Sequence, residues 1–195
     1  TESEMATYPH IVRIAHSIIA EMFSERAITP GVTTTGDLRW YLRQRVTDLG
    51  LDTWFHPSVH VQRQEEAAFD IASMGIDSGE VIKPGDFLHV DFGITYLRLN
   101  TDTQHHAYVL RPGETEAPKG LRDGLAAANA VQDALTAEFV SGRSGNEILA
   151  AARRTIEKAG IDGTIYTHPI GFHGHGAGPG IGAWETQEPR EGLSG

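Results

Sequence analysis

Apolar residues recur every three to four positions in four stretches of the chain, the spacing of amphipathic helices. This pattern predicts helices over residues 8–27, 34–50, 121–139 and 144–160. Two of them begin with a capping box, in which a hydroxyl and an acid three residues later satisfy each other's backbone amides. The two boxes are Thr34 with Asp37 and Ser144 with Glu147. Gly50 and Gly160 stand where a left-handed residue ends a helix.

Elsewhere the apolar period changes to two, which is typical of strands. Residues 87–93 alternate strictly, with Leu88, Val90 and Phe92 on one face and His89 and Asp91 on the other. Shorter strands are predicted at residues 54–55, 59–61 and 164–168, and a strand over 100–110 is predicted to pair antiparallel with 87–93. Helices mixed with antiparallel strands predict an α+β fold rather than a doubly wound parallel sheet.

Composition and charge narrow the possible functions. The 195 residues are 39% hydrophobic and 22% charged, which suits one globular domain. The absence of cysteine excludes disulfide scaffolds, thiolate zinc sites and cysteine nucleophiles. A net charge of -10 disfavours nucleic acid and anionic membranes as partners. The acidic start lacks a basic signal-peptide region, so we expect a cytoplasmic protein, with a secreted or periplasmic location left open.

The first candidate for chemistry is a pair of acids, Asp91 and Asp102, eleven residues apart on the predicted neighbouring strands. Asn100, Thr101 and Thr103 surround Asp102 and can orient its carboxylate. Two carboxylates held close together repel each other unless a cation or a shared proton lies between them. The alternative is two solvated strand or turn residues.

The second candidate is a segment in which His168, His173 and His175 lie among glycines. Imidazole binds zinc, manganese, cobalt or iron, and glycine lets the backbone approach a metal closely. The alternative is a surface loop whose histidines have no role. The neighbouring His105 and His106 must face opposite ways on a strand, so we expect them to be structural.

A third pattern, the glycines of residues 178–183, loosely fits a phosphate-binding loop. A dinucleotide fingerprint has to open a helix. Residues 183–189 have no helical apolar stripe and end in Pro189, so a nucleotide site is not predicted.

Taken together, these motifs resemble the peptidase M24 superfamily of methionine aminopeptidases, Xaa-Pro aminopeptidases and prolidases. The resemblance rests on the Pro84-Gly85-Asp86 turn before the Asp91-bearing strand, on Asp102 eleven residues later, and on the glycine-flanked His175. It covers essentially the whole chain and is nearest to the Xaa-Pro aminopeptidase-like branch. It implies a pita-bread fold, an antiparallel sheet covered by helices. Residues 1–195 would form a single, incomplete metallopeptidase catalytic domain that lacks its carboxy-terminal part.

The resemblance also implies two divalent metal ions, manganese, cobalt, zinc or iron, held by two Asp, one His and two Glu. By position, Asp91 would bind one metal, Asp102 would bridge both, and His175 would bind the other, with His173 as the alternative. The two Glu ligands are expected beyond residue 195, so the chain would hold at most three of five ligands.

The implied reaction is removal of the amino-terminal residue of a peptide by a metal-bridging hydroxide, as in an Xaa-Pro aminopeptidase or dipeptidase. The implied partner is a peptide substrate, and the resemblance leaves a homodimer open. Two family histidines are missing, because residues 73–76 hold none and Gly182 stands at the other position. We therefore expect His173 and His168 to supply the catalytic imidazoles. A non-peptidase hydrolase and a non-enzymatic peptide-binding module on the same fold remain alternatives.

Overall fold

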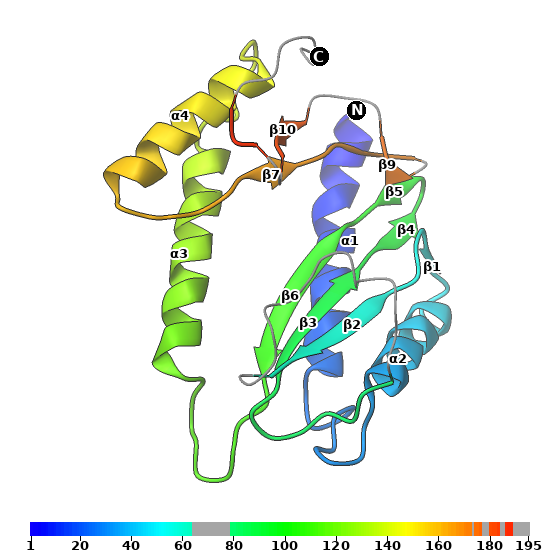
Figure 1. The fold of residues 1–195 in the computed structure, drawn as a ribbon. Coiled ribbons are helices and arrows are strands. Elements are labelled where there is room, and N and C mark those ends of the chain that lie inside the picture. Colours follow the sequence, from blue (N-terminus) through cyan, green and yellow to red (C-terminus); the bar gives the residue numbers. More distant parts are fainter. Residues whose placement is uncertain (64–78, 173, 177–179, 184–185, 189–195) are drawn as a thin grey trace. The chain divides into compact units, whose positions relative to one another are not determined.

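The computed structural model describes residues 1–63, 79–172, 174–176, 180–183 and 186–188. The chain forms two compact units, Thr1–Ala117 and Pro118–Gly195. Figure 1 shows the helices and strands of each unit. Among the described helices, none is long and apolar enough to cross a membrane.

The first unit begins with two helices, α1 (Glu2–Met22) and α2 (Thr35–Asp48). α1 begins at Glu2 rather than at residue 8, because Thr1 and Glu4 form a capping box that the apolar pattern does not signal. It runs through Pro9 and ends at Met22, before the predicted residue 27. α2 begins at the predicted capping box of Thr34, and Gly50 follows it with a φ of 65°.

The main sheet of this unit has the strand order β2-β3-β6 and is antiparallel throughout. Its strands are β2 (Ser58–Gln62), β3 (Phe87–Phe92) and β6 (Thr103–Tyr108). The predicted pairing of the Asp91 strand is therefore confirmed. The predicted strand over 100–110 is shorter, because β5 (Leu99–Asn100) belongs to a second sheet with β1 (Asp52–Thr53) and β4 (Ile94–Tyr96). The strand predicted at 54–55 was wrong.

One face of the main sheet packs on both helices, as Figure 1 shows. Leu88, Val90 and Phe92 are fully buried there. They join a core that α1 and α2 complete with Ile11, Ala15, Ile18, Ile19, Met22, Leu38, Leu42 and Val46. Because successive strand side chains alternate between faces, His89 and Asp91 must lie on the opposite face.

The Pro84-Gly85-Asp86 turn precedes β3 and is held in place by hydrogen bonds to the Asp86 side chain. The Asp86 carboxylate is buried and accepts hydrogen bonds from the Lys83 amide at 2.8 Å and from Arg63 at 2.9 and 3.1 Å. Gly85 has a φ of 95°, a conformation that favours glycine. This motif therefore anchors the start of the strand that carries Asp91.

Gly93 lies where β3 meets the loop before Asp102. A methyl group on Gly93 would lie 2.4 Å from the carbonyl oxygen of Thr101 and 2.4 Å from the indole nitrogen of Trp54. Only glycine fits this space, and the close approach brings the end of β3 against Thr101.

The second unit has two helices, α3 (Lys119–Thr136) and α4 (Gly145–Lys158). α3 ends before Phe139, which the apolar pattern had included. α4 begins at the predicted capping box of Ser144 and Glu147. The two helices share a core with Ile165 and Ile181.

Among the residues described after α4, four short strands form two antiparallel pairs. β7 (Tyr166–Thr167) pairs with β10 (Ile181–Gly182), and β8 (Ile170–Gly171) pairs with β9 (Gly174–His175). Gly182 has a φ of 70°, and a methyl group on it would lie 1.9 Å from the carbonyl oxygen of Ile165. Residues 181–182 form a strand rather than the start of a helix.

Candidate metal centre

The first unit brings the two predicted acids into contact. Asp91 lies half-buried on the face of β3 that points away from the core, and Asp102 follows β5. Burial, followed by the negative charge of Asp102 and a hydrogen bond between the two side chains, together raise the pKa of Asp91 to about 7. Two carboxyl groups in this arrangement share a proton or require a cation.

One carboxylate oxygen of this pair is buried without a hydrogen-bond donor in the described part of the chain. Oδ1 of Asp91 is buried and has no hydrogen-bond partner among the residues that the structure describes. A buried carboxylate oxygen without a donor is unfavourable. A cation would satisfy this oxygen and remove the repulsion between the two acids, so Asp91 and Asp102 fit a divalent metal.

The loop that carries Asp102 is held from several sides. The Thr101 hydroxyl accepts from the Ile94 amide at 3.0 Å, and the Trp54 indole donates to the Thr101 carbonyl at 2.7 Å. The Tyr8 hydroxyl donates to the Asn100 carbonyl at 3.0 Å. Burial, and then the charge of Asp102, raises the pKa of Tyr8. These contacts fix the backbone on which Asp102 stands.

Sequence reasoning missed Tyr8 and Trp54, because both act across long stretches of chain and neither belongs to a motif. It did single out Asn100 and Thr101, but as groups that orient the Asp102 carboxylate. In the structure, both residues also help to fix the loop backbone: the Thr101 hydroxyl accepts from the Ile94 amide, and the Thr95 hydroxyl donates to the Asn100 side chain at 2.6 Å.

The second unit brings two of the predicted histidines together. His175 lies on β9 opposite Ile170, and the Gly176 amide donates to the Pro169 carbonyl at 3.0 Å. This short hairpin sets the ring centroids of His168 and His175 4.0 Å apart. His173 lies outside the described residues.

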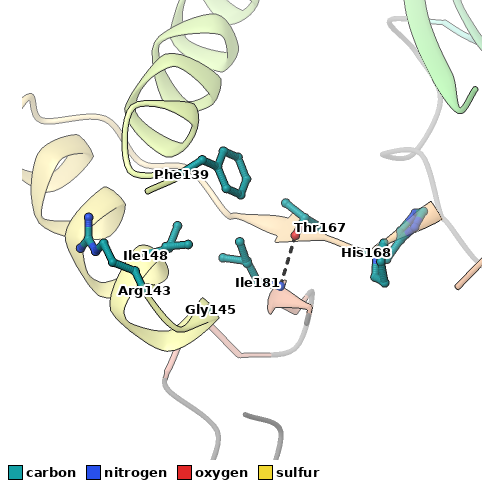
Figure 2. A pocket seen from close by; sticks show the side chains of 8 residues that line it. Phe139, Arg143, Gly145, Ile148, Thr167, His168 and Ile181 are labelled. Carbon is teal, nitrogen blue, oxygen red and sulfur yellow. Dashed lines mark hydrogen bonds between the residues drawn. The ribbon is translucent and has the colours of Figure 1, made fainter. Parts of the chain in front are cut away.

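His168 also borders a cavity of about 290 Å³ within the second unit (Figure 2). Phe139, Ile148 and Ile181 form its apolar side. The Thr167 hydroxyl, on the same rim, accepts from the Ile181 amide at 3.2 Å. A cavity of this size accepts a small apolar group beside an imidazole.

The adjacent histidines His105 and His106 face opposite ways, as predicted. His105 contacts His16 of α1, with 2.9 Å between Nε2 and Nδ1. His106 stacks on Phe87, on the face that carries Asp91. His105 therefore joins the strand to a helix, whereas His106 shares a face with the acid pair.

The fold is the α+β pita-bread fold. The model of metallopeptidase family M24 matches residues 10–192, and the chain belongs to this family. The family suggests a metal-dependent hydrolase. A search of curated proteins gave no match.

Solved structures with this fold include an X-Pro aminopeptidase from Thermotoga maritima, with 20% identity and a TM-score of 0.68, matched over 93% of this chain and 49% of that one. A dipeptidase from Pyrococcus horikoshii has 19% identity and a TM-score of 0.64 over 93% and 48% of the two chains. A methionine aminopeptidase from Thermotoga maritima has 18% identity and a TM-score of 0.57 over 85% and 65%. The chain thus spans about half the length of the first two.

Proposed function

We propose that the protein is a metal-dependent exopeptidase that removes the amino-terminal residue of peptides, of the Xaa-Pro aminopeptidase or dipeptidase type. The observation that carries this proposal is the pair of Asp91 and Asp102, which are hydrogen-bonded, half-buried and left with one unsatisfied oxygen. Family membership supports the hydrolase class, and the similar X-Pro aminopeptidase and dipeptidase structures support the choice of substrate.

Asp91 and Asp102 would together hold the divalent metal ions. His175 remains the sequence-based choice for a further ligand, and His173 the alternative. Carboxylate and imidazole donors accept manganese, cobalt, zinc or iron. When bound, two such cations lower the pKa of a water molecule and polarise the scissile carbonyl.

The chain's own residues would prepare the site and move protons. Asp91 has to lose the proton that it holds up to about pH 7, so the acid pair becomes a full ligand near neutral pH. His168 lies beside an apolar cavity and against the ring of His175, where an imidazole can exchange a proton with a bound substrate. His173 is the second imidazole proposed for this role.

Metal analysis and peptide hydrolysis test the proposal on the full-length protein. We expect the wild type to bind a divalent metal and to release the first residue of Xaa-Pro peptides. Asp91→Asn and Asp102→Asn should lose both properties, whereas the exposed Asp123→Asn on α3 should keep them. Metal content and activity that survive in Asp102→Asn would refute the assignment. Tight metal binding without hydrolysis of any peptide would favour the non-peptidase alternative.

A further inference from the structure

The face of the main sheet that carries Asp91 is an ordered grid of side chains. Strand register places them in three rows across β2, β3 and β6. The rows are Ser58, Asp91 and Gln104; His60, His89 and His106; and Gln62, Phe87 and Tyr108. Three imidazoles therefore lie side by side in the row next to the acid.

The rings of this face form a continuous series. Phe87 and His106 are stacked with centroids 4.9 Å apart and planes at 7°. His106 and His89 are 5.1 Å apart, and His89 and His60 are 6.3 Å apart with planes at 26°. We call these four residues, Phe87, His106, His89 and His60, the ring row.

One contact fixes the ring row relative to the acid pair. Nε2 of His89 lies 2.9 Å from Oε1 of Gln104, which stands directly opposite Asp91. This contact holds the ring of His89 in one orientation on the sheet. Two residues along a strand span about 7 Å, so His89 lies within reach of a side chain whose backbone is bound at Asp91.

The chemistry of the ring row favours a neutral planar group. Burial between its neighbours, and then the charges of His89 and His105, lower the pKa of His106. A chain with a net charge of -10 also repels anionic side chains. Another aromatic ring can extend an offset or edge-to-face series, whereas an aliphatic side chain gains only apolar contact.

We propose that the ring row is the subsite for the side chain of the substrate's first residue and that it selects aromatic side chains. This inference rests on the proposed exopeptidase function, because Asp91 defines where the first residue would lie. If the rings only stabilised the sheet, their removal would lower stability without changing the discrimination between ligands.

The test measures binding without catalysis. The full-length protein, freed of metal and labelled in its histidine rings, is titrated with L-phenylalaninamide and L-leucinamide and followed by NMR. We expect phenylalaninamide to shift the resonances of His60, His89 and His106 and to bind about fivefold more tightly than leucinamide. His106→Ala should abolish this preference, and His106→Phe should retain it because a ring remains. The control is His10→Ala, which removes an imidazole on α1 that contacts Arg13, and it should match the wild type.

Equal binding of the two amides, or an unchanged preference in a folded His106→Ala protein, would overturn the subsite. The same variants are then compared for kcat/KM on Phe-Pro and Leu-Pro peptides. A protein that prefers phenylalaninamide but hydrolyses no peptide would refute the proposed function and the substrate role of the ring row. The ring row would then be a binding site for aromatic groups only. A protein that hydrolyses both peptides equally would retain the function and lose the subsite.

Discussion

Replacing Gly93 by alanine tests the packing that holds the acid pair. The new methyl group would lie 2.4 Å from the Thr101 carbonyl oxygen, 2.4 Å from Nε1 of Trp54 and 2.5 Å from a ring carbon of Phe55. The first two atoms are joined by a 2.7 Å hydrogen bond, so neither can move away without weakening it. The strand end or the loop before Asp102 therefore has to shift.

The magnitude follows from three effects. Overpacking costs about 1–3 kcal/mol, and a weakened hydrogen bond costs about 1 kcal/mol. The lower chain entropy of unfolded alanine offsets about 0.4–1 kcal/mol. We expect Gly93→Ala to lower the free energy of unfolding by about 2–3 kcal/mol, and to weaken metal binding because the displaced loop carries Asp102.

Urea unfolding followed by tryptophan fluorescence and by circular dichroism measures this change. The matched control is Gly124→Ala in α3, where nothing lies within 4 Å of the added methyl group. Alanine is the better helix former, so this control should gain up to about 1 kcal/mol. If Gly93→Ala unfolds within about 0.5 kcal/mol of the wild type, the close approach at Gly93 does not constrain the fold.

Three further substitutions or conditions give independent checks. Asp86→Ala leaves the partly buried Arg63 without its closest carboxylate, so it should lower the free energy of unfolding, measured in urea, by about 2–3 kcal/mol. The control Asp123→Ala, which breaks an exposed ion pair, should lower it by less than about 1 kcal/mol. Gly182→Ala should cost about 3 kcal/mol or more, because its φ is positive and the Ile165 carbonyl blocks a methyl group; a soluble variant with wild-type thermal stability would contradict this. Without metal, the folded protein keeps a proton on Asp91 between pH 3.8 and about 7, whereas the unfolded chain releases it, so the free energy of unfolding should fall across this range. The shift corresponds to at most about 4 kcal/mol, and partial exposure reduces the expected fall to about 2 kcal/mol. Asp91→Asn should remove this pH dependence, and an unchanged profile would show that another group causes it.

Short sequence motifs correctly predicted those helices and strand faces that depend on contacts between residues close together in the chain. The capping boxes at Thr34 and Ser144 fixed the starts of two helices, and alternation fixed the faces of β3. The β4–β5 hairpin was missed because its turn residues, Leu97 and Arg98, both have positive φ, at 49° and 68°. Such turns are usually signalled by Asn-Gly or Asp-Gly, and leucine and arginine give no such signal.

Only the part of the candidate site that depends on nearby residues could be predicted from the sequence. The close spacing of Asp91, on β3, and Asp102, just before the partner strand β6, follows from the sequence pattern. The hydrogen bonds that hold the backbone just before Asp102 come from Tyr8 and Trp54, which lie 92 and 47 residues away from their partners. A periodic pattern has no information on contacts over such distances, so these positioning residues could not be predicted.

The two faces of β3 explain why the fold tolerates an unfavourable carboxyl group. Leu88, Val90 and Phe92 are fully buried on one face, and burial of each such side chain stabilises the fold by about 1.5–3 kcal/mol. Their sum exceeds the cost of about 2 kcal/mol that the raised pKa of Asp91 implies at neutral pH. A slip of one residue would expose all three apolar side chains and bury Asp91, so the core fixes the register. The apolar face thus holds Asp91 beside Asp102, in an arrangement that the two acids would not keep by themselves and that a bound cation would stabilise.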